Sequence, residues 1–224
     1  MEAVQTSTKL DTLNGEYDQL LGTERLKKVF DSFDPERILV TSSFGTTSAI
    51  LLHQISQVAP DHPIYLTNTG YLFEKTLDYK NELVEKLGLN VIEVEAPKNQ
   101  HRFTQENESW KYQPDLCCHI NKVRPTEYLK EDKDIWISGL MRYQNANRAK
   151  LRVFEPKDEL LKFHPNIDMT ESEVQAYATI YELPLHPLMY QGYGSIGCTH
   201  CTTHGEGREG RWVKSAKTEC GLHG

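Results

Sequence analysis

The sequence lacks any apolar run near the ~20 residues that a bilayer-spanning helix needs, and it has no secretion signal at its start. Its first residues, MEAVQTSTKLD, show no basic stretch followed by an apolar one. These absences predict a cytoplasmic protein with no membrane association, where thiols stay reduced. Internal repeats and clear linkers are also missing. A length of 224 residues therefore predicts one sizeable α/β core, or at most two small domains.

An excess of basic residues is missing as well. The formal net charge is −7, which argues against non-specific binding of nucleic acid. A net negative charge still allows an anionic ligand to be held by a local group of arginines.

Cysteine is scarce, with five residues in the chain. Cys117 and Cys118 are adjacent, Cys198 and Cys201 form a C-x-x-C pair, and Cys220 stands alone. In a reducing compartment, two such pairs more often bind metal than form disulfides. Adjacent ligands are awkward on one small ion but can reach different irons of a cubane, so the spacing favours a [4Fe–4S] cluster over zinc. Unligated core thiols are the alternative for Cys117 and Cys118.

Positive charge is expected beside the adjacent cysteine pair. The pair is predicted to open a helix that runs toward Val123, and the positive end of that helix would favour the thiolate form. Lys122, one turn further on, would add a cation beside an anionic cluster.

Strands and helices alternate through the first part of the chain. Strands are predicted at 38–40, 64–67, 90–94 and 135–137, and helices at 49–58 and 74–87, the second closed by Gly88. This alternation predicts a mostly parallel sheet flanked by helices.

Small and polar residues follow these strands. They are Ser42, Ser43, Gly45 and Thr46 after the first strand, Gly70 after the second, and Gly139 and Arg142 after the fourth. A strand, a small-residue turn and a helix in succession point backbone N–H groups at an anion, although an ordinary βα connection has the same layout. Ligands of such sheets bind beyond the carboxyl ends of the strands, so we expect the turns to line one crevice.

Several segments outside this alternation have weaker patterns. Residues 1–14 are predicted to be loose, 16–33 to form an amphipathic helix, 151–154 and 160–163 to form short strands, and 170–181 to form a helix opened by a capping box. The chain after Pro187 is predicted to be irregular.

The glycine-rich end of the chain carries Arg208 and Arg211. A guanidinium fork on such a segment suits phosphate or sulfate, although each arginine alone also fits a solvated surface position. Cys220, followed by Gly221, is expected to be mobile. Mobility suits a nucleophile that meets two partners in turn, and a spare thiol on a frayed tail is the other interpretation.

In combination, these motifs resemble the assimilatory sulfonucleotide reductases, and within them the iron–sulfur branch, the adenosine 5′-phosphosulfate (APS, adenylyl-sulfate) reductases. The matching segments are Ser42–Gly45, Asn68–Phe73, Cys117–Cys118 with Lys122, Ser138–Gln144, Gly192–Thr202, Gly205–Trp212 and Lys217–His223. The two cysteine pairs together with Glu-Cys-Gly-Leu-His at 219–223 are highly specific. The resemblance runs from about residue 36 to the end.

The resemblance implies the fold of the PP-loop ATP pyrophosphatases (adenine nucleotide alpha hydrolase-like) with a mobile C-terminal tail. It implies three parts: an N-terminal helical segment at 1–35, a nucleotide- and cluster-binding α/β domain at 36–204, and an arginine and cysteine tail at 205–224. ATP-using relatives carry Ser-Gly-Gly-x-Asp-Ser where this chain has Ser-Phe-Gly-Thr-Thr-Ser at 43–48. Thr47 therefore replaces the aspartate that helps to hold Mg²⁺.

The resemblance also implies a mechanism in assimilatory sulfate reduction, the route toward cysteine. Cys220 would attack the sulfur of APS, AMP would leave, and thioredoxin or glutaredoxin would release sulfite from the S-sulfo group. The phosphosulfate would lie near Ser43, Gly45, Arg142, Arg208 and Arg211. The cluster, held by Cys117, Cys118, Cys198 and Cys201, would organise the site and, with Lys122, tune its electrostatics.

Alternatives remain open. Residues 70–73, Gly-Tyr-Leu-Phe, resemble the version found in users of the 3′-phospho nucleotide (PAPS), so a PAPS or dual-substrate reductase is the first alternative. An ATP-using PP-loop transferase with structural zinc and a non-catalytic nucleotide-binding protein are the others. The state of association, including a homo-oligomer, is left open by the sequence.

Overall fold

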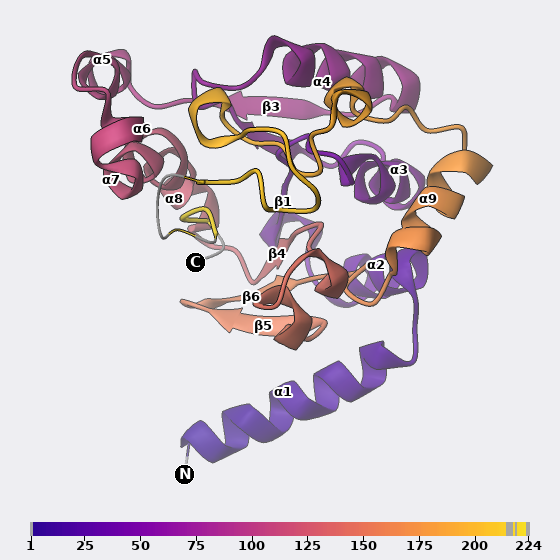
Figure 1. The fold of residues 1–224 in the computed structure, drawn as a ribbon. Helices are drawn as coiled ribbons and strands as arrows, with labels where there is room; N and C mark the ends of the chain where they lie inside the picture. The colour runs from indigo at the N-terminus through magenta and orange to yellow at the C-terminus, as the bar shows by residue number, and fades with distance from the viewer. Residues whose placement is uncertain (1, 214–216, 218, 223–224) are drawn as a thin grey trace.

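A six-stranded sheet forms the centre of the molecule (Figure 1). The computed structural model describes residues 2–213, 217 and 219–222, with side chains from residue 8 onward. The strand order is β3-β2-β1-β4-β6-β5, and only β5 is antiparallel to its neighbour. The strands are β1 Ile38–Thr41, β2 Ile64–Thr67, β3 Val91–Val94, β4 Ile135–Ile137, β5 Phe154–Lys157 and β6 Leu160–Phe163. The predicted mostly parallel sheet is confirmed.

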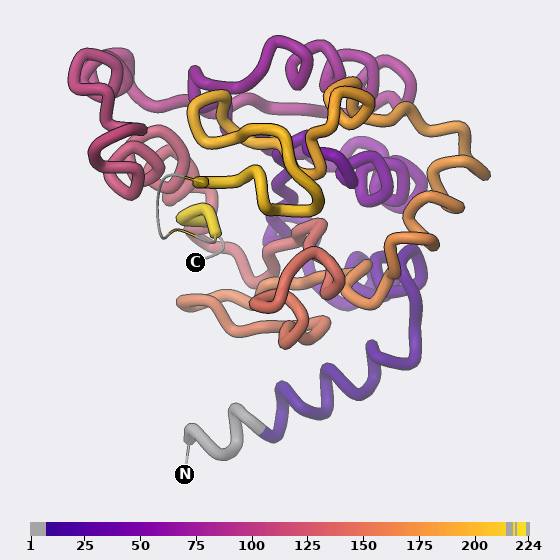
Figure 2. Tube along the Cα trace, in the orientation of Figure 1, coloured from indigo at the N-terminus to yellow at the C-terminus, as the bar shows by residue number. Residues whose placement is uncertain are grey.

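The order of the strands places a switch point beside β1. From β1 the chain adds β2 and β3 on one side and then returns to add β4 on the other side. Connections leave in opposite directions at such a point, and the crevice between them, beyond the strand ends, is where open α/β sheets bind ligands. The segment 187–213 folds back over this edge of the sheet (Figure 2).

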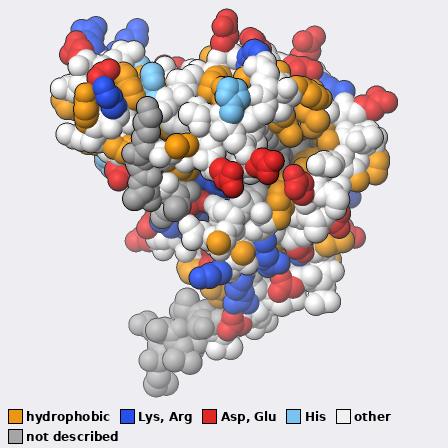
Figure 3. All heavy atoms as spheres, in the orientation of Figure 1, with side chains coloured by type: hydrophobic (Ala, Val, Ile, Leu, Met, Phe, Trp, Pro, Cys, Tyr) orange, Lys and Arg blue, Asp and Glu red, His pale blue; other side chains and the backbone are white. Residues whose placement is uncertain are grey.

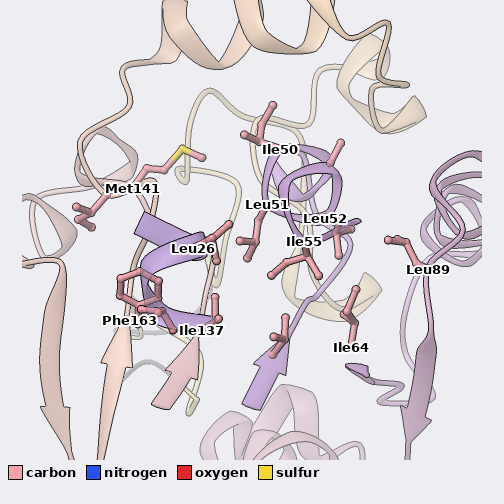
Figure 4. Close-up of a cluster of buried hydrophobic side chains, with 14 of the residues drawn as sticks. Leu26, Ile50, Leu51, Leu52, Ile55, Ile64, Leu89, Ile137, Met141 and Phe163 are labelled. Carbon is pink, nitrogen blue, oxygen red and sulfur yellow. The ribbon is translucent and has the colours of Figure 1, made fainter. Parts of the chain in front are cut away.

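Helices cover the sheet and close its core. They are α2 Gly22–Ser32, α3 Ser48–Val58, α4 Glu74–Leu87 and α9 Glu171–Ile180 around the sheet, and α5 Lys98–Glu106, α6 Ser109–Tyr112, α7 Pro114–Cys118 and α8 Arg124–Glu127 grouped at one end. Ile50, Leu52 and Ile55 of α3 belong to the same buried apolar cluster as Ile64 and Ile137 of the strands (Figure 4). The predicted capping box is present, since Glu173 N donates to Thr170 Oγ1 over 3.3 Å.

The N-terminal prediction was wrong in two respects. Residues predicted to be loose belong to α1, Glu2–Asp18, which lies along β5, and the helix expected at 16–33 is split into α1 and α2. Asn14 gives one reason, because its buried amide pairs with both backbone groups of Phe154, at 2.9 and 3.1 Å. That pairing satisfies part of an edge strand that has no further neighbour.

A glycine marks the split between the two helices. Gly22 has φ +31°, and a Cβ there would lie 2.7 Å from Gln54 Nε2. The close approach lets α2 pack on α3, where Leu26 and Val29 are fully buried. The strand predicted at 151–154 is also displaced, because β5 begins at Phe154.

Among the described residues, no helix combines the length and apolarity needed to cross a membrane. On the face seen in Figure 3, acidic and basic side chains are interspersed with apolar ones. The described part of that face therefore presents a mixed surface and not the broad basic surface typical of nucleic-acid-binding proteins.

Candidate active site

A cavity lies at the carboxyl ends of β1, β2 and β4, as expected for the switch point. We call it the strand-end cavity. It brings together most of the predicted site residues, namely Ser42, Ser43, Gly45, Thr46, Lys122, Gly139, Arg208, Arg211 and Cys220. Segments from five separate parts of the sequence therefore meet at one place.

The turn after β1 borders the cavity with an unusual backbone. Phe44 is fully buried and has φ +49°, a region that non-glycine residues seldom adopt. Its N–H donates to Ser42 Oγ over 3.2 Å, and Ser48 Oγ donates to the Gly45 carbonyl over 2.7 Å. Thr46 and Ser48 line the cavity, so the N-terminal turn of α3 and its positive dipole end border it.

Two predicted residues lie elsewhere. Arg142 is not among the residues lining the cavity, and its Nε donates to the Leu151 carbonyl over 2.9 Å. Gly70 also lies outside the lining; it has φ +72°, and a Cβ there would be 2.7 Å from His101 Nε2. The lack of a side chain at Gly70 therefore leaves room for the His101 ring. Arg142 instead holds the loop that contains Leu151.

Arg148 lines the cavity from the segment where Arg142 was expected to do so. Its guanidinium donates to Glu219 from two nitrogens, both over 2.8 Å, and also to Gln144. Gln144 in turn donates to Thr47 Oγ1 over 3.3 Å. Sequence reasoning missed Arg148 because a polar segment with two arginines six positions apart offers no periodicity that tells which one faces the sheet.

The described residues of the C-terminal segment, 217 and 219–222, pack on the body of the protein. Lys217 Nζ is 2.5 Å from Asp115 Oδ1, and Lys162 Nζ donates to the Leu222 carbonyl over 2.8 Å. The Leu222 side chain packs on an apolar group that includes Trp136. The structure thus shows a docked segment, and its mobility stays a prediction.

Cys220 faces cations inside the strand-end cavity. Burial acts to raise the pKa of its thiol, but the charge of Lys122, the backbone N–H of Leu222 and the charge of Arg211 outweigh burial, so the pKa is lowered. A lowered pKa increases the thiolate fraction, which is the nucleophilic form.

The other four cysteines line a second cavity, which we call the cysteine cavity. Cys117 and Cys118 come to it from α7, and Cys198 and Cys201 from the returning segment. Thr69 Oγ1 lies 3.2 Å from Cys198 Sγ. The structure therefore joins two pairs that are about eighty residues apart in sequence.

The helix predicted to open at the adjacent pair does not begin there. Cys117 and Cys118 are the last two residues of α7, which begins at Pro114, and a π-helical turn, His119–Val123, follows. The thiols are thus away from a positive helix end. Burial raises the pKa of Cys117 to about 12, and the neighbouring Cys118 adds to the effect.

Aromatic rings wall the cysteine cavity. Trp110 stacks on His200 with centroids 4.1 Å apart, and Tyr71 packs edge-on against both rings. The donor set, four thiols with Lys122 beside them, fits an anionic metal centre.

All four thiols line the cysteine cavity. Within the described residues, no group of three or more His, Cys, Asp or Glu side chains is arranged to hold a single metal ion. A tetrahedral zinc site needs sulfurs about 2.3 Å from one centre. Which group the four thiols hold stays a prediction.

Lys122 lines both cavities. Burial acts to lower its pKa, but the nearby Cys220, Cys198 and Cys118 outweigh burial and raise it. Arg211 is a second cation near both sets of thiols, and its guanidinium donates to the Ile196 carbonyl over 3.2 Å. Two cations thus lie near both Cys220 and the clustered cysteines.

This fold and this site define an α/β protein with a mostly parallel sheet and a cavity at the strand ends. The fold is similar to that of phosphoadenylyl-sulfate reductase from Candida auris, with a TM-score of 0.73 at 22% identity over 86% of this chain and 95% of that one. Yeast FAD synthetase has a more distant likeness, with a TM-score of 0.57 at 14% identity over 86% of this chain and 67% of that one. Both likenesses concern the fold.

The chain belongs to the phosphoadenosine phosphosulfate reductase domain family, whose pattern matches residues 37–204. It is 35% identical to an adenosine 5′-phosphosulfate reductase of Chelativorans sp., over 94% of this chain and 89% of the relative. It is 37% identical to a phosphoadenosine 5′-phosphosulfate reductase of Vibrio parahaemolyticus, over 96% and 86%. The protein is therefore a sulfonucleotide reductase, and its relatives differ in the nucleotide they are named for.

Proposed function

We propose that this protein reduces APS to sulfite and AMP, with thioredoxin or glutaredoxin as the reductant, through an S-sulfo group on Cys220. The observation that carries the proposal is the position of Cys220. Its thiol lines the same cavity as the turn after β1 and the two arginines of the glycine-rich segment. The nucleotide would lie across the strand ends with its phosphosulfate toward Arg208 and Arg211.

In the first step the Cys220 thiolate attacks the sulfate sulfur. A bond forms between the two sulfurs while the bond from sulfur to the phosphate oxygen breaks, and AMP leaves with that electron pair. Negative charge grows on the leaving phosphate oxygens. Cations already in place, Arg148, Arg208 and Arg211, favour that charge more than the ground state.

In the second step a thiolate of the reductant attacks the Cys220 sulfur. Sulfite leaves with the electron pair of the sulfur–sulfur bond, and a mixed disulfide remains. The second thiol of the reductant resolves that disulfide and restores Cys220. The two electrons that reduce the sulfate sulfur thus come from the reductant's dithiol.

We further propose that Cys117, Cys118, Cys198 and Cys201 hold a [4Fe–4S] cluster. The four thiols that line one cavity and the adjacent Lys122 support this assignment. When bound, the group would supply a cross-link between α7 and the returning segment, and negative charge next to Lys122. The chemistry at Cys220 needs no electron from it.

Intact-mass analysis tests the role of Cys220. Wild-type protein incubated with APS and no reductant should gain one sulfo group, and Cys220→Ser should bind AMP normally but gain none. An adduct of unchanged yield on Cys220→Ser would rule out Cys220 as the carrier. Glu209→Gln, an exposed change near Arg208, serves as the matched control and should gain the group as the wild type does.

A PAPS or dual-substrate reductase is the second candidate, because relatives named for either nucleotide match this chain almost equally well. A 3′-phosphate adds two negative charges, so a PAPS site needs a cation near the ribose. Steady-state rates of the iron-replete protein with each nucleotide and thioredoxin decide between them. A higher kcat/KM for PAPS would overturn the assignment to APS.

A further inference from the structure

The carboxylate of Glu219 accepts hydrogen bonds from two arginines of the strand-end cavity, Arg148 and Arg208. It accepts from Arg148 Nε and Nη2, each over 2.8 Å, from Arg208 Nη2 over 3.0 Å and from Asn145 Nδ2 over 2.7 Å. The three charged side chains are only 10%, 8% and 16% exposed, for Glu219, Arg148 and Arg208. Such ion pairs are screened little by solvent.

The two guanidinium groups need an anion between them. Burial lowers the pKa of Arg208 to about 10, and the like charge of Arg148 adds to that effect, while Glu219 opposes it. Taking away the partner of a buried charge is strongly destabilising, because the charge is left uncompensated. The pair Arg148 and Arg208 is therefore a built anion site that a residue of this chain fills.

The same site faces the substrate. Both arginines line the strand-end cavity together with Ser43 and Gly45 of the turn after β1. A carboxylate and a phosphate or sulfate oxygen compete for the same guanidinium donors, since all are acceptors for bidentate pairing. Glu219 and an anionic ligand of the cavity thus share donors.

We propose that Glu219 is an internal competitor for the anionic group of the nucleotide. In the nucleotide-free protein it holds residues 219–222 over the cavity, and an oxyanion bound by Arg148 and Arg208 displaces it. This inference rests on the proposed function only for the identity of the natural oxyanion. Displacement by inorganic sulfate follows from the arginine pair alone.

Displacement of Glu219 does not require the whole C-terminal segment to leave. Lys217 pairs with Asp115, and the Leu222 carbonyl accepts from Lys162, so both have partners outside the arginine pair. Cys220 is adjacent to Glu219, so release of the carboxylate frees the thiol to move. Binding of the oxyanion and exposure of the thiol are therefore coupled, and the coupling acts equally in both directions.

Calorimetric binding of sulfate and of AMP to the iron-replete protein tests the competition. Glu219→Gln keeps the shape and hydrogen-bonding capacity but removes the charge, so both ligands should bind more tightly, by roughly fivefold or more, as for typical coupled sites. Glu209→Gln removes an equal charge from an exposed position and should leave both affinities at the wild-type level. A merely structural role of Glu219 would lower kcat without tightening the binding of sulfate.

Alkylation of Cys220 by iodoacetamide, followed by peptide mass analysis, tests the coupling. In the wild type, sulfate should accelerate alkylation relative to chloride at the same ionic strength. In Glu219→Gln, alkylation should already be fast and indifferent to sulfate. Sulfate that slows alkylation in the wild type, or affinities of Glu219→Gln equal to those of Glu209→Gln, would overturn the proposal. These measurements need no turnover, so failure of the sulfo-transfer test would leave them intact.

Discussion

The guanidinium of Arg211 fills the space that a side chain at position 197 would need. A Cβ on Gly197 would lie 2.6 Å from Arg211 Cζ. Gly197 directly precedes Cys198, which lines the cysteine cavity, while Arg211 lines the strand-end cavity. The absence of a side chain at position 197 thus leaves room for a cation that lies near the thiols of both sites.

Substitution of Gly197 by alanine should displace Arg211. The added carbon meets a guanidinium held by the Ile196 carbonyl, so that group must shift away from the cavity. We expect AMP to bind about tenfold more weakly, the loss of one charge-assisted contact. Gly15→Ala, where a Cβ would meet nothing within 4 Å, is the control and should bind AMP as the wild type does. Equal AMP affinity in the two variants would contradict this role of Gly197.

Arg148 and Arg142 offer a direct comparison of placement. Arg148→Lys keeps the charge but cannot donate from two nitrogens of one planar group, as Arg148 now does to Glu219. Because a bidentate guanidinium also suits a phosphate or sulfate, the KM for the nucleotide should rise about tenfold. Arg142→Lys changes a residue that donates to the Leu151 carbonyl outside the cavity and should shift KM much less. Steady-state kinetics of both variants give the answer. A larger rise for Arg142→Lys would show that the sequence had identified the right arginine.

The sheet and its active edge could be predicted because their signals are local. Apolar runs such as Ile135–Ile137 read as buried strands, and the turn residues Ser42 to Thr46 directly follow one of them. Parallel pairing then places all such turns at one edge. The two cysteine pairs could also be identified from the sequence, because cysteine pairs at close spacing indicate a metal site by their residue type alone.

Features that depend on tertiary packing could not be predicted from the sequence. Arg148 faces the cavity because Gln144 and Glu219 hold it there, and neither contact has a sequence signature. Residues 2–14 are helical in part because Asn14 pairs with the edge strand β5, a contact with no sequence signature. The place of Cys117 at the end of α7 follows from a helix start at Pro114 that the polar stretch before it concealed.

The cysteine cavity yields a compositional prediction. Anaerobically purified protein should contain about four irons and about four acid-labile sulfides per chain. Cys198→Ser should lose most of both, because Cys198 is one of the four thiols that line the cavity. Thr203→Ser, an exposed change two residues beyond Cys201, should keep both. Zinc in place of iron and sulfide would overturn the assignment and favour the transferase alternative.

Stability should fall in mild acid because of His186. Burial lowers the pKa of this side chain to about 4, and the charge of Lys75 adds to the effect. Its ring accepts from the Leu188 N–H over 3.2 Å and pairs with Thr76 Oγ1 over 3.0 Å, so it is held neutral in the fold. In the unfolded chain a histidine titrates near 6.5.

The direction of the change in the free energy of unfolding with pH follows from proton binding by the two states. Between pH 6.5 and pH 4 the unfolded chain binds more protons at His186 than the native state does, so the free energy of unfolding decreases as the pH falls through that window. From pH 7.5 to pH 5 this one residue should account for a loss of about 2 kcal/mol.

His186→Asn keeps an acceptor for the Leu188 N–H but cannot titrate. It should be less stable than the wild type at pH 7.5, yet it should lose about 2 kcal/mol less on going to pH 5. Urea unfolding of both proteins at the two pH values measures the difference, and parallel losses in the two proteins would show that His186 is not the titrating group.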